Sequence, residues 1–184
     1  MFRFAQCLTV VTLVALAAGC GSNGGPSNGP TGGDQPAVKP TPAAQAEGKR
    51  LMLAAEPAGG KGVIAIRKEA KDGDEVVVAG QVGGSTKPFT EGRAAFLIVD
   101  PSLSPTDGCE TPWDFCELPK KEVAAARLSV KFVDSEGKTL KGGARELFGI
   151  KELSGVVVKG KVSRDDKDNV IVVATGLFVR PEGK

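Results

Sequence analysis

The sequence predicts a mainly β fold, a small five-stranded barrel with one helix between its third and fourth strands. From about residue 49 onward, the chain consists of short apolar runs that Gly and Asp interrupt. Five of these runs have the Val-rich or alternating pattern of strands, and one segment between the third and fourth runs has helical spacing. A chain of 184 residues is long enough for one such domain with tails.

The first part of the domain is predicted to hold a short helix and two strands. Val63, Ile66 and Ala70 recur at helical spacing, which indicates one or two helical turns. Residues 75–82 are rich in Val and alternate, so they form the first predicted strand. Residues 93–100 are apolar on both faces, and this second strand is therefore expected to lie centrally in the sheet.

A long loop and a clearly alternating strand follow. Residues 101–122 show no period and are expected to form the loop. Residues 127–134 alternate and predict the third strand. Phe132 falls on its inward face, whereas Arg127 and Lys131 fall on its outward face.

The last part supplies the helix and two more strands. Residues 144–153 suit the helix, and residues 155–162 and 169–176 suit the fourth and fifth strands. Gly80 and Gly160 lie on inward faces of their strands, where a small barrel needs bends and close backbone approach. The order strand, strand, strand, helix, strand, strand is that of the five-stranded OB barrel.

Two passages strengthen the likeness to that fold. Residues 63–82 resemble the entry of many bacterial OB domains, in which a short helical turn leads into a strand written V-x-V-x-G-x-V. Residues 96–100 resemble their second strand. The alternative is an immunoglobulin-like sandwich, which has about seven strands and no helix.

The N-terminus has the pattern of an export signal. One Arg is followed by the apolar run 8–18, which is too short for a stable membrane span and ends in small residues. Residues 16–20, Leu-Ala-Ala-Gly-Cys, resemble the lipobox of bacterial lipoproteins. The resemblance implies that residues 1–19 are removed and that Cys20 carries the lipid that attaches the exported protein to a bacterial membrane. The alternative is an ordinary cleaved signal with an incidental Cys. The signal, the lipobox and the OB-like pattern together resemble small exported bacterial lipoproteins with this domain, a family that implies no activity.

A linker is predicted between this anchor and the folded domain. Residues 20–48 are rich in Gly, Ser, Asn, Pro and Ala and contain almost no large apolar side chain. Such a segment cannot bury enough surface to offset the entropy of ordering it, so we expect a disordered linker. The folded domain is then expected to span residues 49–184.

Two cysteines lie close together in the predicted loop. In an exported protein, Cys109 and Cys116 are expected to form a disulfide. On the chain-entropy estimate, a closed loop of this size stabilises the fold by about 2.5 kcal/mol. Trp113 and Phe115 lie between the two cysteines, and they form either an apolar plug over the barrel or an exposed contact patch.

Three loops lie where OB barrels bind their ligands, at residues 83–92, 101–122 and 164–169. We expect them to contact another envelope protein or a glycan. The candidate binding surface consists of Trp113, Phe115, Arg127, Lys131, Asp165, Asp166 and Asp168.

The alternative function is binding of a small ligand or a cation by loop carboxylates, namely Asp107, Asp114, Asp165, Asp166 and Asp168. Residues 164–169 lack the Gly and the bidentate Glu of an EF-hand loop, and a solvated hairpin is the expected structure there. We predict no metal site and no cofactor.

Composition excludes several classes of site. The chain has no His, which rules out Ser-His-Asp catalysis and His-ligated zinc or haem within it. No spaced set of carboxylates or lysines suggests another catalytic site, so a non-enzymatic role is expected. The net charge is +2, aromatic residues make up 5% and Tyr is absent, so nucleic-acid binding is not expected.

Overall fold

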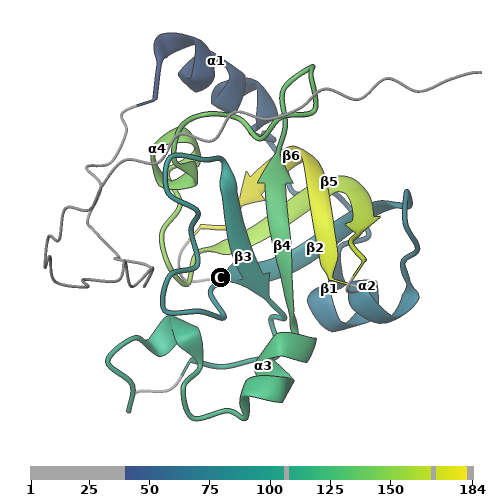
Figure 1. Cartoon of the computed structure of the whole chain (residues 1–184), viewed down its shortest axis with the longest axis vertical. Coiled ribbons are helices and arrows are strands. Elements are labelled where there is room, and N and C mark those ends of the chain that lie inside the picture. Colours follow the sequence, from purple (N-terminus) through teal and green to yellow (C-terminus); the bar gives the residue numbers. More distant parts are fainter. Residues whose placement is uncertain (1–39, 106–107, 167–168, 182–184) are drawn as a thin grey trace, which may run out of the picture. The chain divides into compact units, whose positions relative to one another are not determined.

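Figure 1 shows the protein as a computed structural model, which describes residues 40–105, 108–166 and 169–181. All of them belong to one compact unit, residues 35–184. Its centre is a closed barrel of five strands, whose order around the barrel is β2–β3–β4–β6–β5 and then back to β2. These strands are β2 (Glu75–Val82), β3 (Ala95–Val99), β4 (Arg127–Phe132), β5 (Gly155–Arg164) and β6 (Val170–Val179).

The topology is that of an OB barrel, as the sequence predicts. The strand pairs around the barrel are antiparallel except β4 and β6, which run parallel. Helix α4 (Ala144–Phe148) lies between β4 and β5 in the sequence, which are the third and fourth barrel strands. The immunoglobulin-like alternative is wrong, because the strands close on themselves instead of forming two packed sheets.

A short additional strand pairs with β2 next to the place where β2 pairs with β3. These two strands pair only where Gln81 and Val82 face Val99 and Ile98. Strand β1 (Lys61–Gly62) pairs in parallel with the middle of β2. Sequence pattern does not detect β1, because a strand of two residues has no measurable period.

The core is filled by the inward residues of the strands and by two helices. Phe132 of β4 lies against Phe148 of α4, with ring centroids 4.5 Å apart. Helix α2 (Val63–Glu69) buries Val63 and Ile66 in the same cluster. In Figure 1, α4 and α2 lie on opposite sides of β3 and β4.

Two glycines permit the close backbone approach that the sequence predicts. A Cβ on Gly80 would lie 2.9 Å from the carbonyl oxygen of Val99. A Cβ on Gly160 would lie 2.8 Å from the Cα of Ala174, beside a bulge in the β5–β6 pairing. Neither site has room for a side chain.

The folded part begins earlier than expected. Helix α1 (Pro42–Leu51) occupies residues that composition assigns to the linker 20–48, so the predicted boundary at residue 49 is wrong. The hydroxyl of Thr41 accepts a hydrogen bond from the Ala44 amide and caps the helix. Gly48 packs closely against Leu147 of α4. Tertiary contact therefore orders a segment whose own composition is only weakly apolar.

The long loop 101–122 contains more regular structure than expected. It includes a 3-10 turn, η1 (Pro112–Asp114), and its end runs into helix α3 (Lys120–Ala125). Only Val123 of α3 is buried, so no apolar period marks this helix in the sequence. The predicted helix 144–153 is shorter, because Gly149 adopts a left-handed conformation with φ of 65° and ends α4.

Several expectations concern residues outside the described part of the chain. These are the signal 1–19, lipidation of Cys20, most of the linker, and the carboxylates of Asp107 and Asp168. Within the described residues, no helix has both the length and the apolar character needed to cross a bilayer.

Candidate functional site

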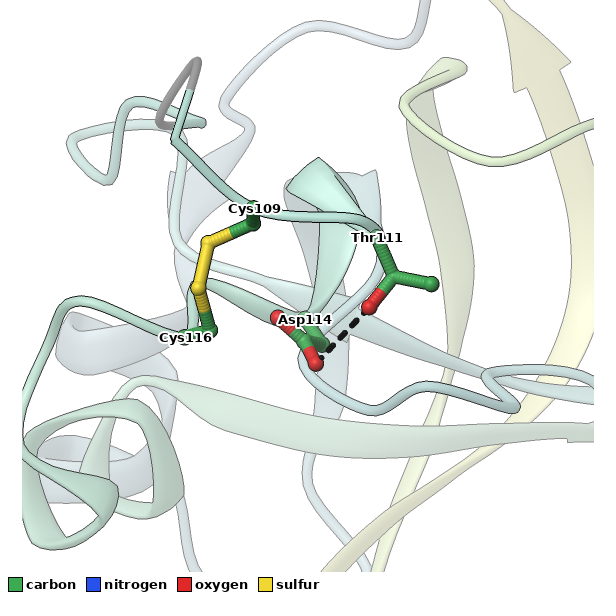
Figure 2. The surroundings of a disulfide bond; sticks show 4 residues. All are labelled: Cys109, Thr111, Asp114 and Cys116. Atoms are coloured by element: carbon green, nitrogen blue, oxygen red, sulfur yellow. Dashed lines mark hydrogen bonds between the residues drawn. A yellow bond between two sulfur atoms is a disulfide. The ribbon is translucent and has the colours of Figure 1, made fainter.

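The disulfide predicted from the sequence is present. Cys109 and Cys116 are joined, with their Cα atoms 6.2 Å apart (Figure 2). Asp114 lies beside this bond, and one of its carboxylate oxygens accepts a hydrogen bond of 2.9 Å from the hydroxyl of Thr111. The cross-link holds the turn η1 at one end of the barrel.

The two aromatic residues inside this loop have different roles. Phe115 is completely buried and forms a second apolar cluster with Val99 and Val123. It adopts a left-handed backbone conformation, φ of 58°, that turns its side chain inward. Phe115 is therefore a plug, and its assignment to an exposed binding surface is wrong. Trp113 is half-buried, and its indole N–H donates to the carbonyl of Thr86 at 3.2 Å.

The structure brings the disulfide loop and the loop 83–92 together. The Gly84 amide donates to the Trp113 carbonyl at 2.7 Å. The guanidinium of Arg127 donates in turn to the Gly84 carbonyl. Two of the three predicted binding loops thus form one packed unit, and Arg127 fixes its position at the start of β4.

Backbone carbonyls also orient two further arginines. Arg67 of α2 donates to the Arg127 carbonyl at 2.9 Å. Arg164, at the end of β5, donates to the carbonyls of Arg67 and Ala70 at 2.7 and 2.9 Å. These bonds tie α2 to β4 and β5.

A buried carboxylate holds the other end of α2. Asp100 is only 7% exposed, and its Oδ2 accepts from the Ile64 amide at 2.8 Å. Its Oδ1 accepts from the Ser102 amide at 3.0 Å. Burial alone would raise the pKa of Asp100, but hydrogen bonds from Ile64, Ser102 and Val63 outweigh burial and lower it. Asp100 is thus an ionised cap for a helix that has no side-chain cap of its own.

The structure does not assemble the loop aspartates into one site. Asp165 is engaged in its own turn, where its oxygens accept the amide and side-chain N–H groups of Asn169 at 2.8 Å each. Asp166 is exposed beside it. Within the described residues, the group of possible metal ligands within 4.8 Å of one another is Cys109, Asp114 and Cys116. Both sulfurs of that group are bonded to each other, so neither is a free thiolate ligand.

A second candidate surface, separate from the predicted loops, lies on the outer side of β4, β6 and β5. Lys131 of β4 lies opposite Val173 of β6, and Val173 lies opposite Lys161 of β5. The neighbouring row runs from Ser129 through Ile171 to Ser163 in the same order of strands. We call these six residues the lysine face: Lys131, Lys161, Ser129, Ser163, Ile171 and Val173.

The lysine face is partly accessible to solvent, and its two lysines are available to a partner. Lys161 is exposed, and the other five side chains are half-buried. Among the described residues, neither lysine takes part in an ion pair or a side-chain hydrogen bond. Glu75 of β2 is the register neighbour of Lys161 on its far side. In Figure 1, no helix lies in front of β4.

Other parts of the outer surface are covered. Val157 and Ala79 point outward on β5 and β2 but are buried, and Gly60 lies against both of them. Val99 of β3 is covered by the disulfide loop through Phe115. The lysine face is thus an outer surface that the described loops leave accessible.

The sequence predicts the outward position of one of the two lysines of this surface. The parity of β4 places Lys131 outward, and the structure confirms it. Lys161 was missed, although the inward run Val156, Val158 and Val162 implies that it points outward too. The register that brings the two lysines into one row depends on the parallel pairing of β4 with β6, which local pattern does not contain.

Comparison with protein-family models and with curated proteins finds no match to this chain. The interpretation of the site therefore depends on its geometry and chemistry alone.

Proposed function

We propose that this chain is an exported lipoprotein, attached to a bacterial membrane through Cys20, whose OB-like barrel is a non-catalytic binding or structural module for an envelope protein or a glycan. The observation that carries the binding role is the lysine face, in which two lysines lie in one row on the outside of a closed barrel. The two lysines can pair with anionic groups of a partner. The barrel that carries them is already folded, so its backbone loses little conformational freedom on binding.

The disulfide supports the exported location. Disulfides persist in secreted and periplasmic proteins and are rare in the cytosol, where thiols are kept reduced. The Cys109–Cys116 bond closes the loop that contains Phe115, which packs against Val99 of β3 in the second cluster. An exported compartment allows this arrangement to remain oxidised.

Fatty-acid labelling in intact bacteria tests the anchor. Cells that express the full chain are fed an alkyne-bearing fatty acid, and the purified protein is examined for label and by mass spectrometry. We expect the lipid on Cys20 of the wild-type chain and no label on the Cys20→Ala variant. Equal labelling of both proteins would refute the anchor.

Cross-linking in the same cells tests the binding role. The wild-type chain should cross-link to a specific envelope protein or glycan, whereas Cys20→Ala, which is not held at the membrane, should show much less of the same product. If neither form yields a specific product, the binding role is refuted.

A further inference from the structure

We infer that the lysine face binds a linear acidic glycan that carries a carboxylate on every second sugar residue. This inference deepens the proposed function and rests on it. The lysine face offers the three kinds of group that such a ligand requires. These are cations for its carboxylates, hydroxyls for its sugar hydroxyls, and shallow apolar surface for the C–H faces of its rings.

The spacing of the lysines sets the spacing of the acids. Lys131 and Lys161 lie in one row with β6 between them. Neighbouring strands are about 4.8 Å apart, so the two lysine backbones are about 10 Å apart. That is comparable to the length of a disaccharide unit. A polysaccharide with one uronic acid per disaccharide therefore presents its carboxylates to both lysines at once.

The residues between and beside the two lysines suit contact with sugar rings. Val173 lies between the two lysines, and Ile171 lies beside it in the next row. Ser129 and Ser163 flank Ile171, and each hydroxyl can both donate and accept a hydrogen bond. The apolar side chains are half-buried and do not protrude. They offer contact area without the large apolar anchors that membrane insertion uses.

An acidic peptide fits this surface less well. A peptide that binds a sheet usually adds a strand at a free edge, and the five barrel strands present no free edge along the lysine face because β4, β6 and β5 are paired on both sides. An extended peptide laid across the face would place side chains on one side about 7 Å apart, which is shorter than the lysine spacing.

A nucleic acid also fits less well. Strands that bind single-stranded nucleic acid present aromatic side chains on which bases stack. The lysine face contains Ser, Ile and Val between its lysines, and Phe132 of β4 points into the core. The lysines would attract the phosphates of a nucleic acid, but the lysine face has no aromatic side chain on which its bases could stack.

Binding of defined oligosaccharides to the full lipidated chain in neutral detergent tests the inference. The ligand is a fluorescent hyaluronan octasaccharide, which carries one carboxylate per disaccharide. An acetylated chitin octasaccharide has similar length and no charge and serves as the ligand control. Fluorescence anisotropy at low salt should show binding of hyaluronan and at least tenfold weaker binding of chitin.

Two double variants locate the site. Lys131→Gln with Lys161→Gln removes both charges and keeps a polar, flexible side chain at each position. Lys120→Gln with Lys121→Gln on α3 removes the same charge from two exposed lysines outside the face. An exposed ion pair contributes only a few-fold to affinity, so the first variant should bind about tenfold more weakly. The α3 variant should bind like the wild type, and both should keep the wild-type melting temperature.

The outcomes are distinct. Equal binding of hyaluronan by all three proteins, or equal binding of chitin and hyaluronan, would overturn the inference. Tighter binding of a thymidine octanucleotide, or of vesicles containing phosphatidylglycerol, would also overturn it and point to a nucleic acid or a membrane. The mass of the lipid on Cys20 is measured on the same preparation. A chain that binds hyaluronan but lacks the lipid refutes the anchor alone, whereas a lipidated chain that does not bind refutes the glycan alone.

Discussion

Replacing Asp100 with Asn should destabilise the protein at neutral pH and much less in acid. In the wild type, the buried carboxylate accepts the Ile64 amide at 2.8 Å and the Ser102 amide at 3.0 Å. Asn keeps one oxygen acceptor, but its NH₂ group then faces a backbone donor. The variant loses a charged hydrogen bond, which contributes about 1.5–3 kcal/mol, and part of a helix cap, which contributes about 0.5–2 kcal/mol. Because the two losses overlap, we expect the free energy of unfolding to fall by about 2–3 kcal/mol.

The ionisation of Asp100 determines how the stability difference between the wild type and the variant changes with pH. The pKa of Asp100 is lowered in the folded protein relative to the ordinary value of 3.8. Its contribution is therefore fully present above that ordinary value and is lost as the pH falls through the lower folded pKa. Thermal melts of the full chain should show the variant about 4–10 °C below the wild type at pH 7. The gap should narrow as the pH is lowered below 3.8.

Asp166→Asn is the matched control, because Asp166 is exposed on the hairpin after β5. It should melt within about 1 °C of the wild type, since exposed substitutions have small effects. Equal melting temperatures of Asp100→Asn and the wild type at pH 7, or a gap that does not change with pH, would refute the assignment of Asp100 as an ionised cap.

Three further changes should also affect stability, as measured by urea unfolding of the full chain. Gly160→Ala should cost about 1–3 kcal/mol by overpacking, whereas Gly155→Ala, whose Cβ would meet its nearest atom at 3.5 Å, should be nearly neutral. Equal effects would contradict the close approach at the bulge. Phe115→Ala should cost about 3–5 kcal/mol because the side chain is completely buried, and a cost no greater than that of Trp113→Ala would show that it is no plug. Reducing the disulfide should lower the free energy of unfolding by about 2.5 kcal/mol, and an unchanged midpoint with dithiothreitol would contradict its stabilising role.

Much of the barrel follows from local pattern. The alternation in β4 and the Val-rich runs of β2 and β5 predict which side chains enter the core, because one face of each strand is buried. The helix between the third and fourth strands, together with the strand order, then favours the OB arrangement, and the structure confirms that fold class.

The remaining features depend on tertiary contact. Helix α1 has Ala and polar residues that resemble a linker, and it is ordered by contact with α4 and by the Thr41 cap. Phe115 is turned inward by a left-handed backbone conformation that no local pattern predicts. Lys131 and Lys161 lie in one row only because of the register of two strand pairs, β4 with β6 and β6 with β5. The sequence therefore predicts the fold better than it predicts the surface that we assign to binding.

The claim that the lysine face is the binding surface of a membrane-anchored module is tested most directly by site-specific photo-cross-linking in intact bacteria. A photoreactive amino acid replaces Lys161 in one chain and Lys121 of α3 in another. Position 161 should give a product of higher mass that a glycosidase returns towards the mass of the uncross-linked chain, and Cys20→Ala should reduce that product. Position 121 should give little of it. The absence of a product at position 161, or equal products at both positions, would contradict the assignment.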